Sequence, residues 1–233
     1  MTNPDPDQAS SDSSGSEPAN SAVLDFSGVH RMIRGYITKL DAAAKNPRDD
    51  AAWTKTLAGL ILFGVTGLRF HHQVEDDEYW PALVAKGADA SLLQPLSASH
   101  RDLDLMLDQL ESAAQRLAAS PTDTAAMSTV ADLMTQFRDH VRNHLDEEEP
   151  VIFPLLAQYI SDAEAHVMAA RAAKNAPRKG IAWMMGGVTY AMTPPESENF
   201  LSAFPKPVIW LRPLILRTYR RNCAILGFDP QFS

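Results

Sequence analysis

Apolar residues recur at helical spacing in four stretches of the chain, at roughly residues 25–45, 50–86, 92–118 and 123–170. Each gap contains residues that break or cap helices: Asn46-Pro47, Gly87, Ser120-Pro121, and Asp123 or Thr124 as the N-cap of the fourth stretch. Because these connections are short, each helix is expected to return antiparallel to the one before it. The pattern predicts an all-α protein built as an up-down-up-down four-helix bundle.

Prolines lie within or beside the second and fourth stretches, at Pro81, Pro150 and Pro154. A proline has no N–H and clashes with the preceding turn, so each is expected to end or kink its helix. The apolar positions that recur with the helical period are expected to form the core: Phe26, Ile33, Ile37, Leu57, Leu60, Ile61, Leu103, Leu107, Leu110, Leu133, Phe137 and Val141.

The two ends of the chain differ in charge from the middle. Residues 1–21 carry four acidic residues and no basic one, a composition that predicts a disordered acidic leader. Residues 22–170, the predicted bundle, have a net charge of −10, and residues 171–233 have a net charge of +6. We expect this basic, apolar C-terminal extension to form one or two helices that pack on the bundle. Its arginines and tryptophans could instead form a patch for an anionic membrane or a partner protein.

Composition excludes several classes of site. Cys223 is the only cysteine, so an internal disulfide and a thiolate cluster are both excluded, and any metal must use nitrogen and oxygen ligands. The N-terminal residues contain no Lys or Arg and no apolar core, which predicts a cytoplasmic protein without a secretory signal. No apolar run reaches the ~18–20 residues of a membrane span, so at most peripheral membrane contact is expected. The pI of about 5.3 and the lack of a reader motif argue against nucleic acid as a partner.

The second and fourth stretches share a motif, a histidine with a glutamate four residues later and a proline ten residues later. The residues are His71, Glu75 and Pro81 in one copy, and His144, Glu148 and Pro154 in the other. Residues i and i+4 project from one face of a helix, so the imidazole and carboxylate can bind one cation or bridge two. Acidic runs, 75–78 and 146–149, surround each glutamate. One carboxylate of each run is expected to face a metal, and the others to be exposed or to orient histidines through hydrogen bonds.

The first and third stretches each add one histidine, His30 and His100. Antiparallel packing can bring all four helices' contributions to one level, which gives four imidazoles and two carboxylates. This donor set suits iron or manganese, and less specifically zinc. Six protein ligands do not saturate two octahedral metals, so positions remain for oxygen, nitric oxide or peroxide.

The combination resembles the hemerythrin-like, or HHE, domains. Their pattern is one His on the first helix, His-x-x-x-Glu on the second, His on the third and His-x-x-x-Glu on the fourth. The resemblance covers residues of about 22–160 and implies two iron ions with an oxo or hydroxo bridge. It also implies the ligands: His30, His71, His100 and His144 as terminal ligands, and Glu75 and Glu148 as bridges. Asp104 stands where oxygen-carrying hemerythrins have a second histidine on the third helix, which favours an open or carboxylate-filled position over five-histidine oxygen storage.

Four further residues near the motifs have more than one interpretation. His140 lies one turn before His144, which permits a role as ligand or as a partner of a ligand. His72 is rotated by about 100° from the motif histidine and is less favoured. Tyr79 could contact a bound ligand or iron, although packing is favoured, and His166 is expected to be solvated.

Two functions are consistent with these features. The leading hypothesis is a diiron protein that binds or reduces oxygen, nitric oxide or peroxide, with enzymatic turnover left open. The alternative is a metal-stabilised, iron- or oxygen-responsive binding module that acts through a partner or a membrane surface. Both need the same metal ligands, so both remain open at this point, as does a third interpretation, a structural bundle that keeps the motif but binds no metal.

Overall fold

The computed structural model of the chain describes residues 20–232, and in that range it contains helices and no strand. The all-α prediction is therefore confirmed. The elements are α1 (Ser21–Lys45), α2 (Ala51–Val74), the π-helical turn η1 (Glu75–Tyr79), α3 (Trp80–Ala85), α4 (Ala90–Ala119), α5 (Thr124–Tyr159), α6 (Asp162–Asn175), α7 (Ile181–Tyr190), α8 (Pro194–Ser202) and α9 (Lys206–Leu226).

Side-chain caps fix where the long helices begin. The side chain of Asn20 accepts hydrogen bonds from the backbone N–H groups of Ala22 and Val23, so α1 starts at Ser21, within the expected leader. The rest of that leader, residues 1–19, lies outside the described residues. Asp123 caps α5, as the sequence allowed, by accepting from the N–H of Ala126.

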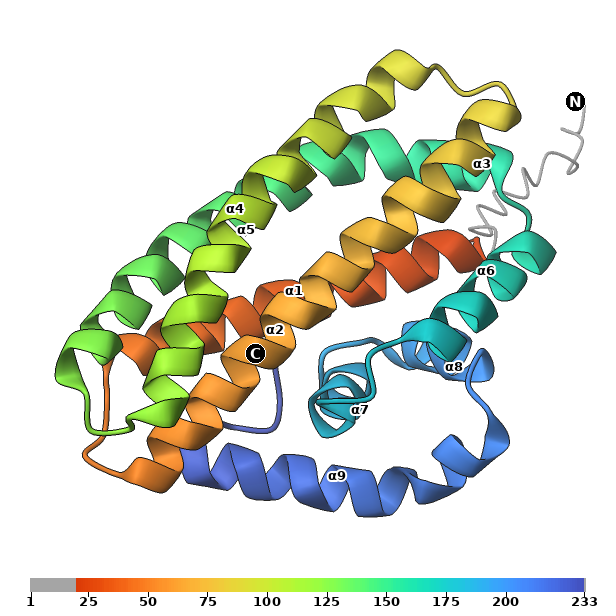
Figure 1. Cartoon of the computed structure of the whole chain (residues 1–233). Helices are drawn as coiled ribbons and strands as arrows, with labels where there is room; N and C mark the ends of the chain where they lie inside the picture. Colours follow the sequence, from red (N-terminus) through yellow and green to blue (C-terminus); the bar gives the residue numbers. More distant parts are fainter. Residues whose placement is uncertain (1–19, 233) are drawn as a thin grey trace, which may run out of the picture.

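The long helices α1, α2, α4 and α5 pack in a closed cycle, in which α1 and α4 each contact both α2 and α5 (Figure 1). Helix α2 continues through η1 and α3, and the chain then turns at Gly87, whose φ of 102° is readily adopted only by glycine. This turn ends the second stretch where the sequence predicted.

The expectation of one helix over residues 123–170 is wrong. Helix α5 ends at Tyr159, and α6 starts with a capping box in which Ser161 and Glu164 bond each other's backbone N–H groups. Apolar periodicity continues across this break because Ile160 and Ala165 are both buried. Pro150 and Pro154 lie inside α5, so neither ends its helix.

The C-terminal extension also differs from the expectation of one or two helices, because it contains α7, α8 and α9. Prolines in the first turns of α8 and α9 start new helices, since proline needs no N–H partner there. Trp183 of α7 and Tyr219 of α9 join the core of the long helices. The Trp53 indole N–H donates to the carbonyl of Leu226, which fixes α9 against α2.

The buried apolar residues form two clusters along the long helices. One cluster contains Leu57, Leu107 and Val141, and the other contains Phe26 and Ile152. All the predicted core residues are buried except Ile33 and Leu133, which are partly buried and pack against the first cluster.

One helical rod, Ala51–Ala85, is long and apolar enough to cross a membrane by length and composition, with a mean hydropathy of 1.3 in its most apolar window. This is weak support for a span, because a helix in the core of a helical protein passes the same test. The rod supplies Leu57, Leu60 and Ile61 to the core.

Truncation of Leu107, which is fully buried, tests the first cluster. Leu107→Ala is expected to lower the free energy of unfolding by about 2–5 kcal/mol, because it leaves a cavity among packed side chains. The matched control is Leu105→Ala on the same helix, where the side chain is 66% exposed and a change within about 0.5 kcal/mol is expected. Urea unfolding measures both, and equal losses would contradict the described packing.

Asp25 is buried where α8 packs on α1, and it accepts a hydrogen bond of 2.9 Å from Asn199 Nδ2. Burial raises the pKa of Asp25 from 3.8 to about 6, and the bond from Asn199 offsets this only in part. The native state therefore binds more protons than the unfolded state between these values, so stability falls as the pH rises through that window.

Asp25→Asn is expected to remove this penalty. The variant should be more stable than the wild type at pH 8, by up to about 3 kcal/mol, and should show no gain at pH 4. Asp102→Asn, at an exposed position, is the control. A gain of the same size at both pH values in urea unfolding would contradict a raised pKa.

Candidate metal centre

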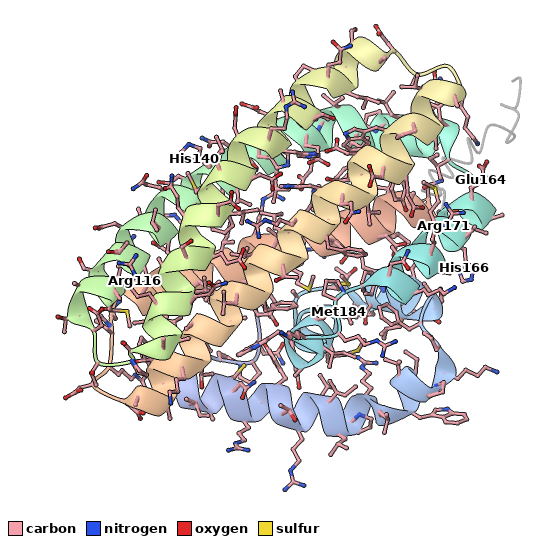
Figure 2. The ribbon with its side chains drawn as sticks, viewed as in Figure 1. Arg116, His140, Glu164, His166, Arg171 and Met184 are labelled. Carbon is pink, nitrogen blue, oxygen red and sulfur yellow. The ribbon has the colours of Figure 1, made fainter. Side chains whose placement is uncertain are left out.

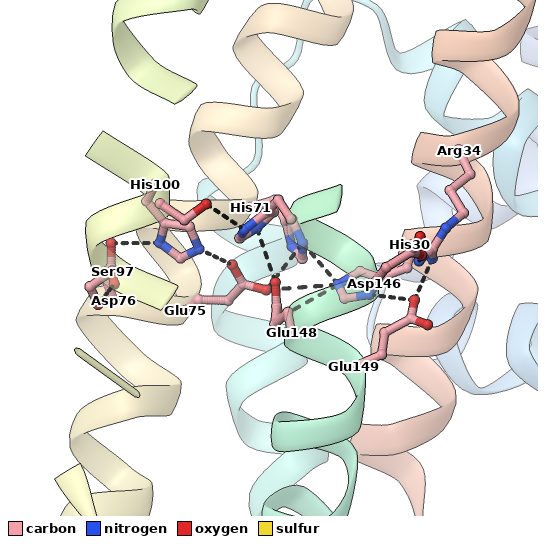
Figure 3. A network of polar contacts seen from close by, with 12 residues as sticks. His30, Arg34, His71, Glu75, Asp76, Ser97, His100, Asp146, Glu148 and Glu149 are labelled. Atoms are coloured by element: carbon pink, nitrogen blue, oxygen red, sulfur yellow. Dashed lines mark hydrogen bonds and ion pairs between the residues drawn. The ribbon is translucent and has the colours of Figure 1, made fainter. Parts of the chain in front are cut away.

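Polar side chains from all four long helices form one buried layer between the two apolar clusters. His30, Glu75 and Glu148 are 0% exposed, and His100 and His144 are 2% exposed. His71 joins them as the least buried member, with 13% of its side chain exposed. The six residues predicted as ligands thus lie together, and Figure 3 labels all of them except His144, which lies beside Glu148.

Glu75 directs its two carboxylate oxygens to different histidines. Oε1 lies 3.1 Å from Nε2 of His71, and Oε2 lies 3.4 Å from Nε2 of His100. His71 is paired in turn with His30, because their Nε2 atoms are 3.2 Å apart.

Glu148 repeats this arrangement from the opposite helix. Its Oε1 lies 3.7 Å from Nε2 of His30, and its Oε2 lies 3.1 Å from Nε2 of His144. Ligand atoms about 2.0–2.2 Å from one cation and at right angles to each other are about 3 Å apart. The pair His30 and His71, with one oxygen from each glutamate, therefore has the spacing to hold one cation. The pair His100 and His144, with the other two oxygens, has the spacing to hold a second cation, and the two carboxylates can bridge these cations.

Apart from the paired Nε2 atoms of His30 and His71, the inward-facing ligand atoms lack hydrogen-bond partners among residues 20–232. The buried, unpaired atoms include both carboxylate oxygens of Glu75 and of Glu148, and Nε2 of His100 and of His144. Burial without a partner is costly for such groups, and a cation would satisfy all of them. The residues present therefore fit a metal.

The charges of the two carboxylates are coupled. Burial and the nearby Glu148 raise the pKa of Glu75 well above its usual value. Burial also acts to raise the pKa of Glu148, but the nearby imidazoles of His144, 3.1 Å away, and His30 bring it below its usual value. Without a metal, the layer therefore favours a charged Glu148 beside a protonated Glu75. Bound cations would stabilise the charged form of both carboxylates.

Acidic residues next to the motif glutamates orient two of the histidines. Nδ1 of His100 lies 2.9 Å from Asp76 Oδ2, and the hydroxyl of Ser97 donates to Asp76 Oδ1 at 2.5 Å. Donation from Nδ1 leaves the lone pair of Nε2 directed into the layer.

Glu149 orients His30 in the same way that Asp76 orients His100, because Oε1 of Glu149 lies 3.0 Å from Nδ1 of His30. The guanidinium of Arg34 donates hydrogen bonds to Glu149 and to Asp146. Figure 3 shows this chain of contacts from α1 to the layer. The Nδ1 atom of His144 lies 3.1 Å from the hydroxyl of Ser99. The acidic runs therefore supply the orienting groups that the sequence analysis allowed, although it did not assign them to individual histidines.

The π-helical turn η1 positions two neighbouring acidic residues, the ligand candidate Glu75 and the orienting residue Asp76. The N–H of Trp80 donates to the carbonyl of Glu75, five residues back, instead of four. The wider turn lets Glu75 enter the layer while the next residue, Asp76, reaches His100 on α4. Pro81 has no N–H, so the regular ladder is interrupted here in any case.

His72, the histidine less favoured as a ligand, is buried in the layer. Its ring is parallel to that of His100, with 4.1 Å between centroids and 6° between planes. One nitrogen each of His72, His100 and His144 lies within 4.8 Å of the others. The lone pair of an imidazole nitrogen lies in its ring plane, however, so the stacked rings of His72 and His100 cannot both direct a nitrogen at one ion. We therefore assign His72 to stacking. Adjacent residues of α2 that are both apolar and buried, such as Leu60 and Ile61, are the signal that this helix is buried on more than one face.

The remaining candidates lie apart from the layer or at its edge. Asp104 and His140 are exposed, and Nδ1 of His140 bonds the carbonyl of Gln136. His166 is exposed, as expected. Tyr79 is buried and packs edge-on against Phe26, with 4.8 Å between ring centroids.

A family model, the hemerythrin HHE cation-binding domain, matches residues 23–172. The chain belongs to this hemerythrin family. No curated protein and no solved structure matches the chain. The hemerythrin domain includes the whole polar layer and ends within α6, so α7, α8 and α9 lie beyond the matched residues. The family assignment and the clustered histidines and glutamates together indicate a cation-binding domain.

Asp76→Asn tests the orienting role of Asp76. The variant is expected to bind Fe²⁺ about 10–100-fold more weakly, because the amide no longer fixes the His100 tautomer through a charged acceptor. Asp77→Asn, one residue along and exposed, is the matched control and is expected to bind like the wild type. Competition with a chelator of known affinity measures both variants, and equal affinities would contradict the assignment.

Proposed function

We propose that this hemerythrin domain is an up-down-up-down four-helix bundle that holds two iron ions and binds or reduces oxygen, nitric oxide or peroxide. The observation that carries the proposal is the direction in which Glu75 and Glu148 point their two carboxylate oxygens. Each carboxylate faces the His30–His71 pair with one oxygen and the His100–His144 pair with the other. An oxo or hydroxo group would complete the bridge.

The chain's own residues would hold the ions, orient the ligands and exclude water. His30 and His71 would hold one ion, and His100 and His144 the other, with Nδ1 bonds fixing three of the four rings. Bound iron supplies one-electron redox chemistry and coordination positions for a small ligand. The apolar clusters on both sides of the layer limit water exchange. Manganese and zinc would also suit these ligands.

The exposure of Asp104 supports binding at an open position. This residue stands where oxygen-carrying hemerythrins have an additional histidine, and it does not reach the layer. We therefore favour a site with a free position for ligand binding or turnover over five-histidine oxygen storage.

Optical spectroscopy tests the proposal on protein purified without chelators. We expect a near-ultraviolet oxo-to-iron band that bleaches with dithionite, returns with oxygen, and changes on addition of peroxide or nitric oxide. Iron-loaded protein with no such band in any redox state would contradict a diiron centre.

Added Fe²⁺ provides a second readout that does not depend on redox chemistry. It should raise the melting temperature of the metal-free wild type, because a ligand that binds only the folded state stabilises it. His71→Ala and His144→Ala should lose most of this rise, whereas the exposed His166→Ala should keep it. A rise that is equal in all four proteins would argue against the layer as the binding site.

A second candidate function has support from α9, which lies at the outer edge of the molecule (Figure 1). Trp210, Leu211 and Leu214 on this helix are 76%, 54% and 62% exposed. Arg217 and Arg221 continue the same face, and neither pairs with an acidic group in the described part of the chain. Side chains project outward from α9 in Figure 2. Exposed tryptophan and leucine beside unpaired arginines suit a peripheral module on an anionic membrane surface.

Vesicle co-sedimentation tests this candidate. The full chain is expected to bind phosphatidylglycerol-containing vesicles and to release them at high salt, and the double variant Trp210→Ser, Leu214→Ser should bind at least fivefold more weakly. Leu105→Ser, an equally exposed leucine on α4, is the control. Unchanged binding of the double variant, or equal binding to uncharged phosphatidylcholine, would contradict the candidate.

A further inference from the structure

A recess of about 170 Å³ lies between the hemerythrin domain and the C-terminal extension. Helices α1 and α2 with η1 form one wall, and α6, α7 and α8 form the other. Several lining residues, including Met184, Phe200 and Phe204, lie beyond the part of the chain that the family model matches. The extension therefore builds a space that the hemerythrin domain alone would not enclose.

The two walls of the recess differ in chemistry. The wall from α6, α7 and α8 is apolar throughout, with small residues such as Ala169 and Ala173 and larger ones such as Phe200. Polar residues occur only on the wall from α1, α2 and η1, and they include His71 and Glu75 of the metal layer. Glu75 is fully buried, and a carboxylate that bridges two cations still has a second lone pair on each oxygen that can accept a hydrogen bond. One side of the recess can therefore accept an apolar body, and the other can bond a polar end group.

The dimensions limit what fits. An apolar cavity of about 150 Å³ holds a molecule the size of benzene, so this recess suits an occupant of roughly six to ten non-hydrogen atoms. Apolar contact with the alanine and phenylalanine side chains would supply most of the affinity, and the polar end would supply orientation.

We propose that this recess binds a small, mainly apolar organic molecule with one hydroxyl-type end group, which lies toward His71 and Glu75. The proposal goes beyond the function described above and holds for any cation in the layer. It gives the extension a role, which is to place an organic ligand at the least buried histidine of the centre.

The probe is 2-phenyl-2-propanol, titrated into the full chain as purified and followed by calorimetry. Ala173→Phe is expected to weaken binding at least tenfold, because the added ring fills the recess. Ala163→Phe adds the same ring at an exposed position of the same helix and should leave binding unchanged. Equal affinity in both variants would overturn the proposal, and so would equally tight binding of isopropylbenzene, which lacks the hydroxyl.

Methyl NMR locates the probe in the wild type and does not depend on the folding of a variant. With Zn²⁺ added, the methionine methyl signals of Met32 and Met184, which line the recess, are expected to shift on titration. Met184 is labelled in Figure 2. Met106 and Met127 do not line the recess and should not shift. Shifts confined to Met106 and Met127, or shifts of equal size at all four methionines, would place the probe outside the recess and overturn the proposal.

Discussion

Two fully buried carboxylates, those of Glu75 and Glu148, set the main physical constraint on this molecule. A carboxylate without partners in an apolar interior is strongly unfavourable, so positive charge must reach both from within the fold. Each long helix brings an imidazole to the same level, and burial lowers the pKa of His71 and of His100, so these rings are neutral donors. The positive charge would therefore come from a cation that the imidazoles and carboxylates hold together. The apolar core is divided into two clusters because this polar layer crosses it.

Most of the helices and the residues of the layer could be predicted because both depend on spacing along a helix. The i,i+4 pairs of His71 with Glu75 and of His144 with Glu148 fix a common face without reference to other helices. Single-helix reasoning was insufficient where several helices decide the outcome. His72 is buried because α2 has neighbours on more than one side, and Asp76 meets His100 because a π-helical turn shifts the helix by one residue.

The breaks between helices were harder to predict than the helices. Ser161 ends the fourth stretch through a local capping box, while the apolar period continues past it. The extension forms more helices than expected because its prolines start helices at their first turns. The extension packs on the core of the long helices through Trp183 and Tyr219. This packing buries one face of α9 and leaves Trp210 and Leu214 exposed on the other. The extension thus shapes access to the metal centre without supplying a ligand.

The central claim is that the two carboxylates bridge two cations. Anomalous diffraction from crystals of the iron-loaded protein, recorded on both sides of the iron absorption edge, tests it most directly. The account predicts two iron peaks, one beside His30 and His71 and one beside His100 and His144, each in contact with oxygens of both Glu75 and Glu148. A single peak, or an ion held by His72 together with His100 and His144, would contradict it.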